Sequence, residues 1–311
     1  MKIGFVGTGS IARRHMENLQ IICQQRNENL VIDLFRSGHG QGLPEHLQKL
    51  IHHTFLLKDS IPEDYDVIFI TNPTSLHLQT LQKFQNYGKA FFIEKPVFHT
   101  GKVDLETLGL SKSKIFYVAC PLRYTPVIQY IKQHIDFRDV YAARAISSSY
   151  LPDWRPGTDY RKTYSARKDL GGGVSIDLIH EWDYITYLMG FPRQVASIQR
   201  HLSALEIDCE DLSVYIADYP TATVELHLDY FGKMPLRRLE LFMKNDTVEC
   251  DLINGSIRYF KQQRTLCFEK ERNVFQRNEL QYFFGILDGK CENTSTISHA
   301  CKVLRLAEGK E

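Results

Sequence analysis

Apolar and polar residues follow two different patterns along the chain. In the first 120 residues, short apolar runs end in polar or turn-forming residues, and apolar residues recur at helical spacing between several of these runs. Strands that alternate with helices are typical of a parallel sheet with helices on both faces. The runs are Ile3–Val6, Leu30–Phe35, Thr54–Leu57, Asp66–Ile70, Lys89–Ile93 and Lys114–Ala119. The pattern predicts an α/β domain over residues 1–120 with a doubly wound parallel sheet, including a helix over Pro44–His53.

The pattern changes after residue 120. Apolar segments of strand length now follow one another with short turns between them, which predicts a mostly antiparallel open sheet. These segments are Val140–Ser149, Leu212–Ala217, Thr221–Leu228, Arg238–Met243, Thr247–Leu252 and Ile257–Phe260. Two helices, Asn278–Gly289 and Ser298–Gly309, are expected near the end of the chain. We therefore predict a second, α+β domain over residues 121–311.

Composition and charge narrow the range of partners. The 311 residues are 43% hydrophobic, and 38 basic against 37 acidic side chains give a formal charge of +1. Such a balance provides no overall field for nucleic acid or an anionic membrane, and no apolar run is long enough to span a bilayer. The seven cysteines are scattered without a CxxC pair, which disfavours a disulfide framework and a zinc site. We expect a cytoplasmic protein with reduced thiols, no metal, and neither nucleic acid nor a membrane as partner.

A glycine-rich loop, Gly7-Thr8-Gly9-Ser10-Ile11-Ala12, lies between the first expected strand and the first expected helix. In such a loop the first glycine permits the tight turn, and the second lets the backbone approach a pyrophosphate. A small residue at the third position lets helix and strand pack closely, and the helix amino terminus favours phosphate. The loop predicts dinucleotide binding by Gly7, Gly9, Ser10, Ile11 and Ala12.

The end of the second strand bears on the choice between NAD and NADP. An acid at this position suits the ribose 2′-hydroxyl of NAD, whereas an arginine suits the 2′-phosphate of NADP. Arg36 and Ser37 stand at the strand end, and Asp33 lies further back within the strand. We expect NAD(P) binding with NADP favoured through Arg36 and Ser37. The alternative is that Arg36 is solvated and Asp33 binds the ribose.

Two further strand ends reach the same edge of the predicted sheet. The exit of the fourth strand is Thr71-Asn72-Pro73, followed by His77, and these residues are candidates for cofactor contact. His77 could equally be a satisfied residue on a helix face. The fifth strand runs into Glu94-Lys95-Pro96, where proline favours extended geometry for the preceding residue. Lys95, together with Glu94, is thus expected at a ligand-binding edge, where a partly desolvated lysine can assist proton transfer.

The second predicted domain contains a polar pair in an apolar segment. Gly171–Gly173 precedes a run that predicts one buried helix, and Asp177 and His180 would project from one side of it at i, i+3 spacing. Burial of an acid and an imidazole costs free energy unless they have partners or a function. Histidine is the usual acid or base near neutral pH, so we predict catalytic roles for His180 and Asp177. A structural polar network is the alternative.

A nearby segment has the composition of a carbohydrate pocket. Aromatic rings can stack on sugar faces while charged groups bind hydroxyls, and the candidates are Trp154, Arg155, Tyr160 and Arg161. Between Arg155 and Lys168 five basic residues face one acid, Asp159. This excess predicts an anionic or nucleotide-linked sugar, although a solvated loop would show the same composition.

Taken in order, these motifs resemble the glucose-fructose oxidoreductase/inositol dehydrogenase/MocA (Gfo/Idh/MocA) family. The resemblance covers essentially the whole chain and includes the glycine loop, Glu94-Lys95-Pro96, the Arg123-Tyr124 segment and the helix with Asp177, His180 and Asp183. It implies a dehydrogenase or reductase that moves a hydride between NAD(P) and a CH–OH carbon of a sugar, sugar derivative or polyol. Lys95 would contact the reacting hydroxyl, His180 would be the acid or base, and Arg123 and Tyr124 would contact substrate.

The resemblance has one local departure and leaves some questions open. In the commoner family pattern three residues separate the aspartate and histidine, but here only Leu178 and Ile179 do. Family members commonly form homodimers or homotetramers through the sheet of the second domain. Val224, Leu226, Leu228 and Tyr230 could supply such a face or pack within one subunit. A nicotinamide-assisted glycosidase or lyase, or a non-catalytic NAD(P)-binding regulator, are the alternative functions.

Overall fold

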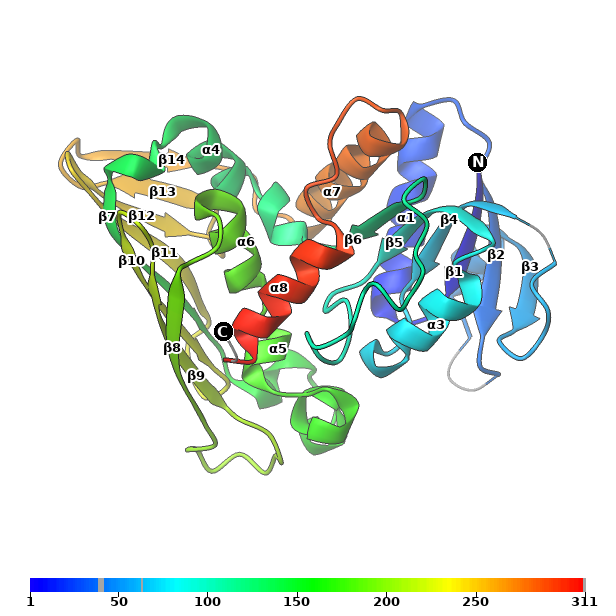
Figure 1. Cartoon of the computed structure of the whole chain (residues 1–311), viewed down its shortest axis with the longest axis horizontal. Helices are drawn as coiled ribbons and strands as arrows, with labels where there is room; N and C mark the ends of the chain where they lie inside the picture. Colours follow the sequence, from blue (N-terminus) through cyan, green and yellow to red (C-terminus); the bar gives the residue numbers. More distant parts are fainter. Residues whose placement is uncertain (39–41, 63, 310–311) are drawn as a thin grey trace. The chain divides into compact units, whose positions relative to one another are not determined.

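The computed structural model describes residues 1–38, 42–62 and 64–309 (Figure 1). Residues 39–41, 63 and 310–311, which belong to the two predicted domains, lie outside the described residues. The chain forms two compact units. Unit 1 comprises Met1–Ala119 and Gln276–Cys301, and unit 2 comprises Cys120–Phe275 together with the chain from Lys302 onward.

Unit 1 is built on a six-stranded sheet in the order β3-β2-β1-β4-β5-β6. All neighbouring strands in it are parallel. The strands are β1 (Lys2–Val6), β2 (Val31–Arg36), β3 (Ile51–Leu56), β4 (Tyr65–Ile70), β5 (Gly88–Ile93) and β6 (Ile115–Val118). This order is that of a dinucleotide-binding Rossmann sheet, so the predicted fold of the first domain is confirmed.

Helices cover both faces of this sheet. The helices are α1 (Ser10–Gln25), α3 (His77–Phe84) and α7 (Arg272–Leu287). Phe283 of α7 packs against Phe92 and Tyr117, with ring centroids 5.3 and 5.4 Å away. On the opposite face, Phe84 of α3 meets Phe35 at 4.9 Å. A helix from near the end of the chain is thus part of unit 1.

The expected helix over Pro44–His53 is wrong. Only one helical turn forms, α2 (Glu45–Gln48), and β3 starts at Ile51, three residues before the expected strand. From Ile51 onward the backbone pairs with β2. Pairing at the edge of the sheet satisfies backbone groups that a short, mostly exposed helix would leave to water.

Unit 2 contains an eight-stranded sheet in the order β14-β13-β12-β11-β7-β10-β9-β8. Every neighbouring pair is antiparallel except β10 with β7. The strands are β7 (Val140–Ser148), β8 (Gln194–Arg200), β9 (Leu212–Asp218), β10 (Thr223–Asp229), β11 (Leu236–Met243), β12 (Thr247–Asp251), β13 (Ser256–Tyr259) and β14 (Arg264–Cys267). The predicted mostly antiparallel sheet is confirmed.

One face of this sheet is covered by the helices of unit 2, which are α4 (Pro126–His134), α5 (Val174–Asp177), α6 (His180–Met189) and the last part of α8 (Ile297–Ala307). Trp182 of α6 packs edge-on against Tyr215 of β9, with ring centroids 5.2 Å apart. Four residues that could have formed an oligomer face are at most 1% exposed: Val224, Leu226, Leu228 and Tyr230. They pack within the subunit, so the idea that they form an oligomer face is corrected.

All seven cysteines are free thiols in the structure. Among the described residues, no helix has the length and apolar character that crossing a membrane would need.

Candidate active site

The glycine loop of unit 1 has the geometry that a pyrophosphate requires. Gly7 has φ +109°, and a Cβ there would lie 2.9 Å from backbone atoms of Thr71 and Asn72. Gly9 precedes α1 and has no other atom within 4 Å of the place a Cβ would occupy. Ala12 is fully buried. The turn thus excludes a side chain at Gly7 and leaves the backbone at Gly9 open to a ligand, with Ser10 and Ile11 in the first helical turn.

Asp33 is directed into the sheet. It is 1% exposed, it lies three residues before the end of β2, and its Oδ2 accepts a hydrogen bond of 2.9 Å from the Tyr65 hydroxyl. Its Oδ1 accepts a 3.1 Å bond from the His53 backbone N–H. These contacts disfavour the alternative in which Asp33 binds the ribose. Arg36 and Ser37 stand at the carboxyl end of the strand.

The loop after β4 is fixed by internal hydrogen bonds. The Thr71 hydroxyl donates to the Val6 carbonyl at 2.9 Å, and the Asn72 amide donates to Thr80 at 2.8 Å. Pro73 precedes the short helical turn that leads to His77. The Thr71-Asn72-Pro73 backbone therefore lies beside Gly7 in a defined conformation.

The His77 side chain has no access to a ligand, so its expected contact with the cofactor is corrected. His77 is 1% exposed. Its Nε2 lies 2.9 Å from the Asn72 carbonyl, and its Nδ1 lies 3.1 Å from the Pro96 carbonyl. Burial lowers the pKa of His77, although the hydrogen bonds to these carbonyls oppose the shift. The ring fastens the loop after β4 to the loop after β5.

Glu94 connects the end of β5 to α1. Its Oε1 lies 2.6 Å from Nε2 of His15, which is 1% exposed, and its Oε2 accepts a 3.2 Å bond from the Lys95 backbone N–H. Burial alone would raise the pKa of Glu94, but the hydrogen bond and charge of His15, with Lys95, outweigh burial and hold this pKa below its ordinary value. Glu94 thus fixes the backbone on which Lys95 stands. His15 is a site residue that the sequence analysis missed.

Replacing Glu94 by glutamine is expected to lower the free energy of unfolding by about 2 kcal/mol at neutral pH, because a buried charged hydrogen bond is lost. The lowered pKa means that ionised Glu94 stabilises the fold above the unfolded value of about 4.3, and that this contribution disappears as pH falls through the folded pKa. The difference from wild type should therefore shrink in acid. Urea unfolding at both pH values measures it, with the exposed Glu45→Gln as control. An unchanged difference in acid would contradict this.

In unit 2, several predicted residues gather around Asp177. Asp177 is 6% exposed, and its Oδ2 accepts a 2.6 Å bond from the Tyr230 hydroxyl. The negative charge of Asp177 raises the pKa of Tyr164, and burial adds to this shift. Trp154 stands edge-on to Tyr230 at 5.3 Å, and Arg155 lies over the Tyr164 ring at 5.5 Å. The structure thus brings Trp154, Arg155 and Asp177 together and adds Tyr164 and Tyr230.

The expected continuous helix through Asp177 and His180 is wrong. α5 ends at Asp177, and α6 begins at His180. Leu178 has φ −96° and ψ +26°, which interrupts the helical hydrogen-bond pattern. The two residues therefore do not share one side of a single helix. His180 is half-buried and stands in the first turn of α6.

The three glycines before α5 allow a close approach by the protein's own backbone. A Cβ at Gly172 would lie 2.8 Å from the carbonyl oxygens of Ser165 and Arg167. Glu210 then bonds the start of α5: its Oε1 accepts a 2.6 Å bond from the Ser175 hydroxyl. The glycine run therefore packs the backbone of Ser165 and Arg167 against the segment that leads into α5.

Arg123 is buried against Asp183, which favours a structural role over its predicted direct contact with a substrate. Its side chain is 1% exposed and binds Asp183 in a bidentate manner, with N···O distances of 2.8 and 2.6 Å. Tyr124 is also buried, at 6% exposure. Because Asp183 lies in the first turn of α6, Arg123 holds the turn that begins with His180.

Acidic partners offset part of the positive charge that the sequence shows between Arg155 and Lys168. Arg161 pairs with Asp159 at 2.8 Å and with Glu206 at 3.0 Å. Tyr160 accepts a 3.1 Å bond from the Glu206 backbone N–H. Arg167 pairs with Asp169 at 3.0 Å. Trp154, Arg155 and Tyr160 line a cavity of about 10 Å³, which has room for a water but not for a sugar.

A parallel sheet in the order β3-β2-β1-β4-β5-β6 with an open glycine loop after β1 defines a dinucleotide-binding domain. Residues 1–107 match the model of the oxidoreductase family with an NAD-binding Rossmann fold. This match agrees with the resemblance to the Gfo/Idh/MocA family that the motifs of the chain indicated.

Alignments with individual relatives extend over more of the chain. Uncharacterized oxidoreductase YrbE of Bacillus subtilis is 26% identical over 192 residues, which are 60% of this chain and 53% of that protein. Inositol 2-dehydrogenase/D-chiro-inositol 3-dehydrogenase of Lacticaseibacillus casei is 25% identical over 214 residues, 64% of this chain and 58% of that protein. The chain thus spans a little over half the length of these relatives.

The whole fold also has solved counterparts. A levoglucosan dehydrogenase, solved in complex with NADH and levoglucosan, superimposes with a TM-score of 0.80 at 16% identity. The alignment covers 99% of this chain and 95% of that one. At this identity the likeness establishes the fold of both units.

Proposed function

We propose that the protein is an NAD(P)-dependent oxidoreductase that transfers a hydride between the nicotinamide and a CH–OH carbon of a sugar, sugar derivative or polyol. The observation that carries this proposal is the open backbone at Gly9, at the carboxyl edge of a Rossmann sheet whose strand β5 ends two residues before Lys95. The family match over residues 1–107 and the dehydrogenases among the relatives support it.

For the cofactor, the proposed contacts follow the edge of the sheet. Gly7, Gly9 and the first turn of α1 would hold the pyrophosphate, and the backbone of Thr71, Asn72 and Pro73 would lie next to it. Arg36 and Ser37 would meet the adenosine ribose and favour its 2′-phosphate, hence NADP over NAD. When bound, the nicotinamide supplies a carbon that accepts or donates a hydride.

For the chemistry, Lys95 would bind the reacting hydroxyl and stabilise its developing negative charge. His180 would take the hydroxyl proton during oxidation and return it during reduction. Asp177, bonded to Tyr230, would bind the substrate through its remaining acceptor capacity. Glu94 and Asp183 act through backbone and helix placement: Glu94 holds the Lys95 backbone, and Asp183 with Arg123 holds the first turn of α6.

The substrate class within the proposal is a sugar that carries a phosphate or carboxylate. Arg155 lies over the ring of Tyr164, which interacts with Asp177, and Arg155 forms no ion pair within the described part of the chain. An arginine held on an aromatic ring can bind an anionic group in a bidentate manner. Arg161 and Arg167 are engaged by acids, so Arg155 is the better candidate for this contact.

The test is a panel of neutral sugars, polyols, sugar acids and nucleotide sugars, each with NAD and with NADP, followed by absorbance of the reduced nicotinamide. We expect reduction with at least one compound and faster turnover with NADP. Consumption of a sugar without net reduced cofactor would instead indicate a glycosidase or lyase. Cofactor binding with no turnover across the whole panel would support a non-catalytic regulator and contradict the proposal.

The assembly and the location of the protein remain predictions. On the face of the eight-stranded sheet opposite Tyr215, Ile198 and Ile216 are 61% and 47% exposed. Such exposure favours a homodimer or homotetramer, which light scattering would measure. The free thiols of the seven cysteines are consistent with a cytoplasmic protein.

A further inference from the structure

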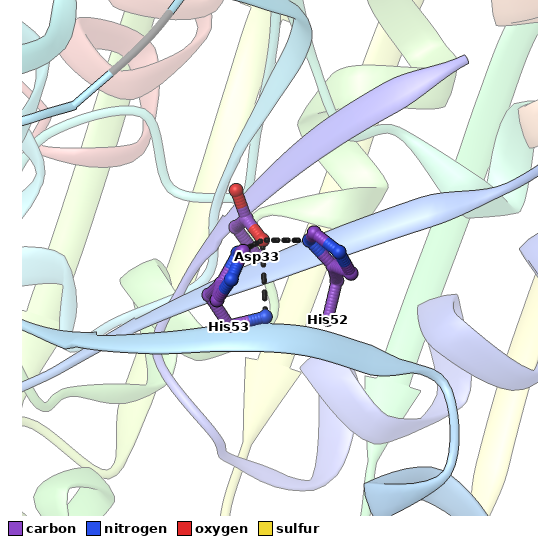
Figure 2. A group of neighbouring side chains, drawn as sticks. All are labelled: Asp33, His52 and His53. Atoms are coloured by element: carbon purple, nitrogen blue, oxygen red, sulfur yellow. Dashed lines mark hydrogen bonds and ion pairs between the residues drawn. The ribbon is translucent and has the colours of Figure 1, made fainter.

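A register shift at the edge of the parallel sheet brings two adjacent histidines to one carboxylate. Ile32 pairs with Ile51, but the next residue of β2, Asp33, pairs with His53, so His52 is an extra residue in β3. In a regular strand, adjacent side chains point to opposite faces. A one-residue irregularity re-aims the side chains around it. Figure 2 shows the result, with both imidazole rings turned toward Asp33 of the neighbouring strand.

The distances between the polar atoms match a metal site. The Nδ1 atoms of His52 and His53 lie 3.6 and 3.4 Å from Oδ1 of Asp33. The two rings are nearly perpendicular, at 72°, with centroids 3.9 Å apart. A tetrahedral ion with bonds of about 2.0–2.1 Å would hold its ligand atoms roughly 3.3 Å apart. The three candidate ligand atoms all lie within 4.8 Å of one another, so one ion could bind all three if the side chains close around it.

The carboxylate is held in place from the protein interior. Asp33 is 1% exposed, and its other oxygen, Oδ2, accepts the 2.9 Å hydrogen bond from the Tyr65 hydroxyl. A partner of this kind orients a metal-binding carboxylate. The side chains of His52 and His53 are 59% and 55% exposed, so a fourth coordination position would open to water. A buried, oriented acid and two accessible imidazoles thus form a site that solvent ions can reach.

The charges around the site set its selectivity. The Lys2 ammonium, with its Nζ 3.7 Å from Oδ2, reduces the attraction for another positive charge. An ion attracted only by charge would therefore bind weakly at this site. An ion that forms strong bonds to imidazole nitrogen would bind more tightly. Two nitrogens and one oxygen suit zinc and neighbouring transition metals and disfavour Mg²⁺ and Ca²⁺.

We propose that Asp33, His52 and His53 bind one divalent transition-metal ion, with Zn²⁺ as the best fit, and that this ion fastens the edge strand β3 to β2. The earlier expectation of no metal rested on the cysteines and did not consider this histidine pair. The site uses residues of unit 1 alone and is independent of the proposed hydride transfer.

The test is calorimetric titration of chelator-treated, tag-free protein with ZnCl₂. We expect one Zn²⁺ per chain, with affinity weakened more than about tenfold in both His52→Ala and His53→Ala. His46→Ala is the matched control, because His46 is also exposed, lies in α2 and pairs with Glu17 instead of Asp33. Lys2→Met should tighten binding, because it removes the neighbouring positive charge. Circular dichroism would verify that each variant is folded.

Two further measurements separate the site from incidental zinc binding. Zn²⁺ should raise the melting temperature of wild type and of His46→Ala but not of His52→Ala or His53→Ala. Co²⁺ should give the visible absorption of a low-coordinate site in wild type but not in His52→Ala or His53→Ala. Absence of Zn²⁺ binding, or equal affinity in wild type and both histidine variants, would overturn the proposal.

Discussion

Replacing Lys95 by methionine is expected to reduce turnover by about 10²–10⁴-fold while cofactor affinity stays nearly unchanged. Methionine keeps most of the length of the side chain but removes the ammonium that would bind the reacting hydroxyl. The backbone should keep its conformation, because the bond from its N–H to Glu94 does not involve the side chain. Steady-state rates with a substrate from the panel, and fluorescence titration with the reduced cofactor, measure the two effects.

Lys89→Met provides the matched control, since Lys89 lies in β5, the strand that leads to Lys95, but its side chain is 75% exposed and pairs with Asp66. This variant should retain its rate and its cofactor affinity. If Lys95→Met turned over at the wild-type rate, Lys95 would have no role in the chemistry.

Replacing Gly9 by alanine is expected to weaken cofactor binding by more than about tenfold without loss of stability. No protein atom lies within 4 Å of the place that the new methyl group would occupy, and Gly9 has φ −62°, which alanine adopts readily. The fold should therefore accept the change. The methyl group would instead occupy the space through which the backbone approaches the pyrophosphate. Fluorescence titration and thermal unfolding measure affinity and stability in the same sample.

Gly7→Ala should have the opposite effect on stability from Gly9→Ala. Its Cβ would meet backbone atoms of Thr71 and Asn72 at 2.9 Å, in a residue with φ +109°, so the fold itself should lose stability. Measurements on both variants would distinguish the role of Gly7 in the fold of the turn from the role of Gly9 in cofactor binding. Wild-type affinity in Gly9→Ala would show that the cofactor does not lie over this loop.

The sequence was sufficient to predict both sheets, because their apolar runs have clear periods and clear ends. It missed β8 and β14, which lie at the two edges of the eight-stranded sheet. Edge strands bury less, and Ile198 in β8 is 61% exposed, so neither segment shows strong apolar alternation. The helix expected over Pro44–His53 was too long for a related reason. Ile51 and the residues after it pair with β2 at the edge of the sheet, and this pairing outweighs their helical spacing.

The candidate site was predicted less well, because partners distant in sequence decide where a polar side chain points. The buried pairing of Arg123 with Asp183 joins residues 60 positions apart. The contact of Tyr230 with Asp177 spans 53 positions. Local pattern also could not indicate that Leu178 interrupts the helix. One signal was available but not used: His15 lies one turn after Ala12 on the buried face of α1, and a buried histidine needs a partner.

The contact of Phe283 with Phe92 and Tyr117 has a consequence for the order in which the protein can fold during synthesis. The ribosome delivers all six strands of the first sheet early, but the helix that shields these aromatic rings emerges only after the large sheet has been translated. A nascent or truncated chain that ends at residue 119 would therefore expose rings that are buried in the finished protein and would be prone to aggregate.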